Sequence, residues 1–204
     1  MTRRIALMLL FGLLHSNAWA QQTPDHLSDQ EIAAAVAARP DKGFVYVEDM
    51  GFATPSNCSA QMPSEAIFTP AGWLNAQSIN ARKQYLPFHP TPDDTLRVLR
   101  VISKGCANGT AAGPACDTIS RVALLSDKGG KVVVESISQH PLTQSWQNGY
   151  GATAACSALV SQFSLADVQK VRNGKGEFLI ATFNGAQLPK TYTVKEKHIK
   201  KLGI

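Results

Sequence analysis

The chain alternates short apolar segments with polar connections that are rich in glycine and proline. Segments enriched in valine, isoleucine, leucine or aromatic residues predict β-strands. The strands expected from this pattern cover residues 43–47, 64–69, 95–103, 119–126, 131–138, 152–163, 177–183 and 190–194. For 152–163 a helix is the alternative, and we favour a strand that carries Cys156. Asp127 to Gly130 joins two of the expected strands as a hairpin, since glycine can adopt positive φ. Pro189 places the last strand at a sheet edge, because proline donates no ladder hydrogen bond.

Helical spacing and capping residues predict three or four short helices. The expected helices cover residues 29–39, 70–85, 165–172 and 194–204. Ser28 followed by Glu31 fits a capping box, in which each side chain satisfies a free backbone N–H at the helix start. Pro40 ends this first helix. Ser164 is a suitable N-cap for the third helix.

These elements predict an α+β domain, with a mostly antiparallel sheet of about six or seven strands and three or four short helices. The strands over 95–103, 119–126 and 131–138 do not alternate cleanly between apolar and polar residues. Both faces of the sheet are therefore expected to be at least partly covered. Glycine, proline and asparagine predict the loops. The expected loops cover residues 51–63, 86–94 and 139–151.

The first twenty residues have the pattern of a secretory signal peptide. Arg3 and Arg4 form a basic start, an apolar run follows, and Ala18-Trp19-Ala20 fits the cleavage rule. A membrane anchor is the alternative, but His15 interrupts the apolar run before the roughly 20 residues that a spanning helix needs. The expected division is a signal peptide over residues 1–20, a flexible leader over 21–27 and a single exported domain over 28–204. The domain is expected in the periplasm or outside the cell, with no integral membrane segment after cleavage.

Composition narrows the class of protein further. The chain has 204 residues, of which 44% are hydrophobic and 17% charged, and this excludes a disordered protein. The formal net charge of +5 falls to +3 once Arg3 and Arg4 are removed with the signal peptide. A charge this mild does not favour nucleic acid as a partner.

All four cysteines lie in the expected domain, and an even number in an oxidising compartment predicts structural disulfides. Three pairings are possible. We expect Cys106–Cys116, because the small and turn-forming residues between them let a short loop close, and with it Cys58–Cys156. The chain has no C-x-x-C and no histidine close in sequence to a cysteine, which disfavours zinc. No metal and no cofactor is expected.

Candidate catalytic residues are few. The sequence lacks the hydrolase motifs G-x-S-x-G, S-x-x-K and H-E-x-x-H. His89 and His140 each precede a proline and could form a metal or acid–base site with Asp93 or Asp94. We favour the simpler interpretation, in which the histidines lie in two separate loops and the acidic pair is turn chemistry before a strand. No catalytic residue is assigned.

The stretch 144–151 is the first candidate binding site. Trp146 and Tyr150 lie there among glutamine, asparagine and glycine, and Trp73 could line the same groove. Aromatic rings beside amide groups suit a sugar ring or a peptide. The alternative is an aromatic lid over the core.

The C-terminal tail is the second candidate. From residue 190 onward Glu196 is the one acidic side chain. The basic residues are Lys190, Lys195, Lys197, Lys200 and Lys201. Such a patch suits anionic lipid headgroups or an acidic partner, and the alternative is a solvated helix face.

Residues 156–183 carry C-x-A, then a helix with Asp and Lys, then G-K-x-x-F-L-I-A-T-F. This order is similar to the C-terminal part of the invasion-associated locus B-like periplasmic proteins. The resemblance covers less than a fifth of the chain and implies no catalytic residue, and we assign no family from it.

The sequence thus predicts an exported, non-enzymatic soluble domain that binds a protein or a cell-envelope component. Two alternatives remain open: a small secreted hydrolase, and an inhibitor or immunity-type module. A pocket that gathers histidines and carboxylates would favour the hydrolase. A flat aromatic or basic patch would favour the binding domain, and an exposed, disulfide-braced loop at 106–116 would favour the inhibitor.

Overall fold

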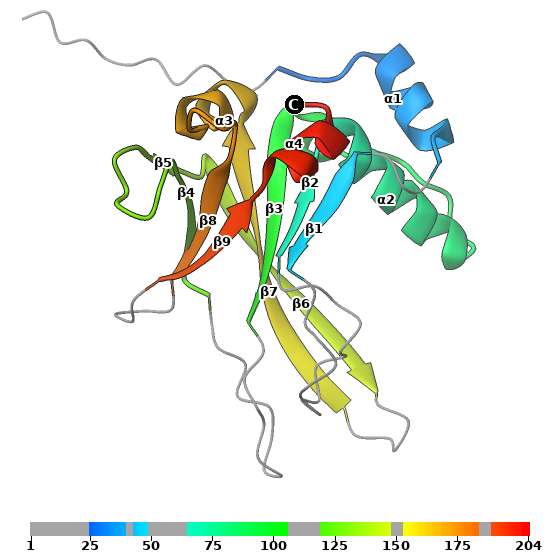
Figure 1. Ribbon diagram of the computed structural model, residues 1–204. Helices are drawn as coiled ribbons and strands as arrows, with labels where there is room; N and C mark the ends of the chain where they lie inside the picture. Colours follow the sequence, from blue (N-terminus) through cyan, green and yellow to red (C-terminus); the bar gives the residue numbers. More distant parts are fainter. Residues whose placement is uncertain (1–24, 40–42, 49–64, 106–118, 148–152, 184–188) are drawn as a thin grey trace, which may run out of the picture.

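The computed structural model shows two antiparallel sheets that pack face to face, with helices at one end and on one side (Figure 1). The α+β class expected from the sequence is confirmed. The strands form two sheets instead of the one expected, and the described part of the chain holds nine of them. The structure describes residues 25–39, 43–48, 65–105, 119–147, 153–183 and 189–204.

The larger sheet has five strands in the order β1-β2-β3-β7-β6. Its strands are β1 (Phe44–Glu48), β2 (Glu65–Phe68), β3 (Val98–Gly105), β6 (Ser138–Gln147) and β7 (Thr153–Ser164). The smaller sheet has four strands in the order β5-β4-β8-β9. Its strands are β4 (Arg121–Leu125), β5 (Val133–Glu135), β8 (Phe178–Phe183) and β9 (Lys190–Val194). The β4–β5 hairpin and the edge position of β9 are both as the sequence predicted.

Four α-helices and one short 3-10 helix accompany the sheets in the described part of the chain. They are α1 (Asp29–Ala37), α2 (Pro70–Lys83), η1 (Asp93–Thr95), α3 (Leu165–Val171) and α4 (Glu196–Leu202). The capping box of Ser28 and Glu31 and the Ser164 cap are both present, which confirms the local signals for α1 and α3. No helix within the described ranges is long and apolar enough to cross a membrane.

The core fills the space between the two sheets. On the five-stranded sheet Leu99 and Phe163 are paired across β3 and β7, and both side chains are buried. Ile180 of β8 faces them from the four-stranded sheet, while Val168 of α3 and Ile199 of α4 close one end of the same cluster. Because apolar side chains exclude water best in one continuous cluster, this packing holds the two sheets together.

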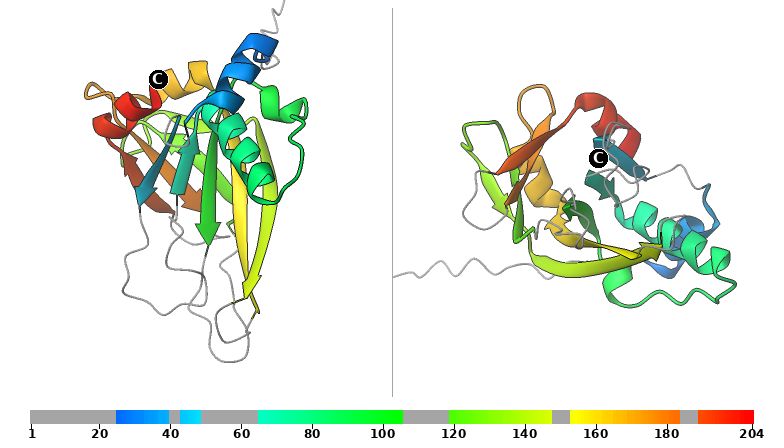
Figure 2. Two further views of the ribbon diagram at one scale, coloured as in Figure 1. Left: turned by 90° about the vertical axis from the view of Figure 1, so that its right-hand side faces the viewer. Right: turned by 90° about the horizontal axis from the view of Figure 1, so that it is seen from below.

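The second face of the five-stranded sheet is covered by α2, and α1 packs against α2 (Figure 2). This layer explains why β3 does not alternate between apolar and polar residues, since Val98 and Arg100 are as buried as Leu99. The cover is only partial at β5, which is an edge strand with Val133 half exposed.

Two expected irregular segments are ordered instead. The stretch 139–151 was expected to be a loop, but Ser138–Gln147 forms β6 and pairs along β7. Its polar composition is compatible with a strand because β6 is the sheet edge, where Pro141 need not donate a ladder bond. Within the expected flexible leader, His26 forms an isolated bridge with Leu96. The backbone N–H of Arg97 donates to the carbonyl of Asp25, so this segment is tied to the domain.

Candidate functional site

Arg100 of β3 is a fully buried cation on the face of the sheet that α2 covers. The strand register places Phe68 of β2 and Gln162 of β7 on either side of it. A guanidinium loses its hydration when buried, and this burial lowers the pKa of Arg100 from its ordinary value, against the opposing charges of Asp93 and Asp94. Its Nη2 has oxygen acceptors and the Trp73 ring lies against the guanidinium, whereas Nε and Nη1 are buried and have no hydrogen-bond partner among the described residues.

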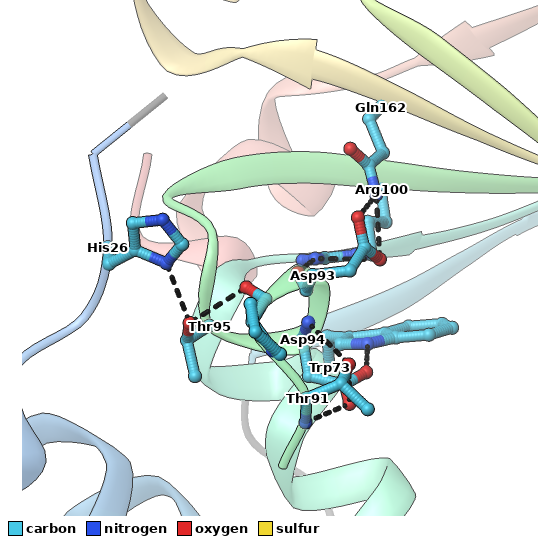
Figure 3. A network of polar contacts seen from close by, with 9 residues as sticks. His26, Trp73, Thr91, Asp93, Asp94, Thr95, Arg100 and Gln162 are labelled. Carbon is cyan, nitrogen blue, oxygen red and sulfur yellow. Dashed lines mark hydrogen bonds and ion pairs between the residues drawn. The ribbon is translucent and has the colours of Figure 1, made fainter. Parts of the chain in front are cut away.

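The contacts of Arg100 join four elements (Figure 3). Its Nη2 donates to the backbone carbonyl of Asp93 and lies 3.7 Å from the Asp93 carboxylate. Its guanidinium carbon lies 5.1 Å from the centre of the Trp73 ring, a cation–π arrangement. Gln162 Nε2 donates to both Asp93 oxygens, at 2.8 and 3.0 Å. Together these contacts fix η1 onto the sheet.

Asp94 is held by a second set of hydrogen bonds (Figure 3). The Trp73 indole N–H donates to Oδ1 at 2.8 Å, and the backbone N–H and hydroxyl of Thr91 donate to Oδ2 at 2.9 and 2.7 Å. Burial alone would raise the pKa of Asp94, but these bonds and the Arg100 charge outweigh it and hold the pKa below its usual range. A carboxylate with all three donors in place is a fixed anchor and a poor proton acceptor.

The N-terminal segment joins the edge of this network. His26 Nδ1 lies 2.8 Å from the Thr95 hydroxyl (Figure 3). Arg97 bonds the Glu31 carboxylate of α1 at 2.6 Å. The network therefore connects the N-terminal segment, α1, α2, η1 and the five-stranded sheet. The chemical arrangement of this network supports a structural role, which is to position the connection between α2 and β3.

Some residues of this network could be identified from the sequence, but their roles in it could not. Trp73 was a candidate ligand-binding residue, and the structure engages it with Arg100, Asp94 and the Phe68 ring, whose centre lies 5.7 Å away. Asp93 and Asp94 were interpreted as turn chemistry. Arg100 and Gln162 were missed, because a charged residue in the apolar segment 95–103 reads as the polar side of a strand. An arginine between Leu99 and Val101 was the signal available.

The aromatic stretch is only partly described. Trp146 lies in β6 opposite Ala154 of β7 instead of in a loop. The Trp146 side chain and the whole of Tyr150 lie outside the described residues, so the groove with Trp73 stays a prediction.

The lysines of the tail surround a helix, as expected. Lys195 precedes α4, and Lys197, Lys200 and Lys201 lie within it. All four side chains are exposed. Lys200 pairs with Glu196 at 2.7 Å, and Lys201 Nζ lies 5.7 Å from the centre of the Phe44 ring.

The two histidines are not both in loops. His89 is exposed in the connection after α2, whereas His140 lies in β6 opposite Val160. No group of three or more histidine, cysteine, aspartate or glutamate side chains gathers as a metal site within the described ranges. Of the cysteines, Cys156 lies in β7, and its side chain is outside the description. Cys58, Cys106 and Cys116 lie outside the described residues, so both disulfides stay predictions.

A shallow hollow of about 210 Å³ lies between the β4–β5 turn, the connection from α3 to β8, and β9. It is lined by Ser126, Asp127, Lys128, Asn173, Glu177, Phe178, Leu179 and Thr193. Two of its polar groups serve the local turns, since Asp127 and Asn173 accept backbone N–H groups of their own loops. This hollow holds no histidine, and the hydrolase alternative stays a prediction.

Comparison with known proteins gives no match: no family model, no curated protein and no solved structure is significantly similar to this chain.

Proposed function

We propose that this protein is an exported, non-enzymatic domain that binds an anionic component of the cell envelope through α4. The observation that carries the proposal is the exposure of Lys195, Lys197, Lys200 and Lys201 around one short helix. We call these four residues the α4 lysine surface. The signal peptide expected from the sequence supports a location in the periplasm or outside the cell.

The α4 lysine surface is held in place by the core. Ile199 and Leu202, on the inner side of the helix, are both buried in the main cluster. The backbone that carries these lysines is therefore already ordered, and only the lysine side chains lose conformational freedom on binding. Glu196 balances Lys200, whereas the other three lysines form no ion pair within the described part of the chain.

His198 reports the positive potential of this surface. Burial lowers its pKa first, and the charges of Lys197, Lys195 and Lys201 lower it further. A cation that opposes protonation of a neighbour also attracts anions. The same field would draw lipid phosphates to the helix, at about 1 kcal/mol per lysine near an anionic surface.

Binding of the purified mature protein to vesicles tests the proposal. We expect retention on vesicles rich in phosphatidylglycerol, none on phosphatidylcholine, and loss of retention at high salt. The variant K195Q/K197Q/K200Q should bind roughly a hundredfold more weakly, from about 1 kcal/mol for each lysine removed. The matched control K128Q/K131Q/K175Q removes the same charge from exposed positions elsewhere and should bind as the wild type. Equal weakening in both variants, or binding that is insensitive to salt, contradicts the proposal.

A further inference from the structure

Tyr85 follows the last residues of α2 in a conformation that disfavours it. Its φ is +57°, and every other residue with positive φ in the described ranges is a glycine. The N–H of Leu86 donates to the carbonyl of Ala81 at 2.9 Å, and the N–H of Tyr85 donates to that of Arg82 at 3.1 Å. This pair of bonds is a Schellman motif, and Tyr85 occupies the left-handed position where glycine is preferred.

The same chain uses glycine at the equivalent place in another helix. Gly203 ends α4 with a φ of +73°, and its N–H donates to the carbonyls of Ile199 and Lys200. A side chain at this position brings Cβ close to the backbone and strains the fold. Tyr85 therefore destabilises the end of α2 relative to glycine.

The Tyr85 side chain does not offset this strain by packing. It is 97% exposed, and the neighbouring Leu86 is 57% exposed. A large aromatic ring that is exposed to water at a strained backbone position contributes no packing energy to the folded chain. Backbone strain that no contact within the chain offsets is typical of positions that contact a ligand or partner. Tyrosine is also enriched among the residues that dominate the binding energy of protein interfaces.

The segment that displays the ring is held at both ends. Its start is fixed by the Schellman bonds to α2, and its far end by the bonds of Thr91 and Trp73 to Asp94. Between them stand Pro87 and Pro90, whose rings restrict φ. A segment ordered in advance loses little conformational entropy on binding.

The charge around the ring indicates what the partner presents. Arg82 and Lys83, in the last turn of α2, are both exposed and form no ion pair within the described part of the chain. The nearest acidic residues along the chain, Asp93 and Asp94, are committed to the Arg100 network. We propose that Tyr85 and Leu86 are the anchor of a protein-binding site, and that the partner is a protein with an apolar pocket bordered by carboxylates. This site is independent of the α4 lysine surface.

Stability of the free protein gives the first test, and it needs no partner. Tyr85→Gly should raise Tm by about 3 °C, because the strain is relieved and no packing is lost. Tyr85→Phe should leave Tm unchanged. A lower Tm for Tyr85→Gly would mean that the ring supports the fold, and it overturns the proposal.

Photo-crosslinking in the native envelope gives the second test. The full chain carries a benzoylphenylalanine at position 85, and purified mature protein is added as competitor. Wild type and Tyr85→Phe should suppress the adduct, whereas Tyr85→Gly should need at least a tenfold higher concentration. Because this variant is expected to be the more stable one, its failure cannot come from unfolding.

A charge-reversal pair tests the chemistry of the partner. Arg82→Glu with Lys83→Glu should weaken competition several-fold, while Lys131→Glu with Lys175→Glu changes the net charge equally and should not. The crosslinked peptide should come from a protein surface with apolar and acidic side chains. An adduct with lipid or with a second copy of this chain, or equal competition by Tyr85→Gly, overturns the proposal. None of these outcomes bears on vesicle binding by α4.

Discussion

Trp73 and Asp94 are joined by a hydrogen bond of 2.8 Å from the indole N–H to a carboxylate oxygen. The bond links α2 to η1 across 21 residues of sequence, and it lies beside the buried Arg100. This bond fixes the far end of the connection that follows α2. The bond stabilises the fold, because it helps to keep the partly buried Asp94 carboxyl ionised.

Trp73→Phe should remove this bond and keep an aromatic ring between Phe68 and Arg100. We expect a loss of about 1–2 kcal/mol in the free energy of unfolding. The pKa of Asp94 should rise, since a donor to its charged form is lost. Urea denaturation measures the first effect, and NMR titration of the Asp94 carboxyl measures the second.

A double-mutant cycle separates the bond from the change in ring size. In an Asp94→Ala background the effect of Trp73→Phe should be smaller, because alanine leaves no oxygen to accept the indole N–H. Equal effects in both backgrounds would show that the indole packs and does not bond.

Gly72 should not tolerate a side chain. A Cβ there would lie 1.9 Å from the carbonyl oxygen of Gly43, because the start of α2 rests against the backbone before β1. Helix propensity alone would make Gly72→Ala stabilising by about 1 kcal/mol. We expect instead a destabilisation of about 3 kcal/mol from overpacking.

Thermal or urea unfolding measures this, with Gly174→Ala as the matched control. A Cβ at Gly174 meets nothing within 4 Å, so that variant should unfold within about 0.5 kcal/mol of the wild type. A Gly72→Ala protein as stable as the control would show that α2 and β1 are not in close contact.

The stability of the domain should fall as the pH is lowered through the range where His198 titrates. Burial and the lysine charges place the pKa of His198 below its ordinary value of 6.5. The unfolded chain therefore binds a proton at a higher pH than the folded one does. The resulting loss begins as the pH falls past the ordinary value and is complete below the folded pKa. Protonation of Nδ1 also removes the acceptor that bonds the Lys195 N–H at 3.2 Å.

NMR titration of His198 checks the cause. Lys197→Gln should raise the pKa of His198, whereas Lys131→Gln should leave it unchanged. His198→Gln should reduce the loss of stability between neutral and mildly acidic pH, since glutamine still accepts at this capping position. An unchanged His198 pKa in Lys197→Gln would refute the electrostatic account of the α4 surface.

Peptide mapping of the unreduced mature protein by mass spectrometry tests the predicted disulfides. We expect no free thiol, one crosslinked peptide that holds Cys106 and Cys116, and a second that holds Cys58 and Cys156. Either of the two other pairings would contradict the loop-closure argument, and free thiols at all four positions would contradict structural disulfides altogether.

Local chemistry could be predicted from the sequence because its causes lie within a few residues. The Ser28–Glu31 box, the Ser164 cap and the turn from Asp127 to Gly130 each depend on neighbours along the chain. The strand that became β6 was missed for the opposite reason. Its residues are polar, and they are extended because β7 supplies hydrogen-bond partners along the whole length.

The candidate sites divide in the same way. The α4 lysine surface follows from composition and helical spacing, since exposed lysines need only a helix to display them. Arg100 could not be found in this way, because its ring contact, its carboxylate and Gln162 come from three separate parts of the chain. Tyr85 could be recognised only from the backbone conformation, because its unfavourable φ arises where α2 ends.

By itself the sequence determined the α+β class, most of the helices and strands and the basic tail, all of which depend on local composition. Only the tertiary structure decided that the strands form two sheets, that a charge is buried beside Trp73, and that Tyr85 is displayed in water. The physical reason is that burial, desolvation and strain are properties of a packed whole. Residues far apart in the sequence create them together, and no short stretch of sequence contains them.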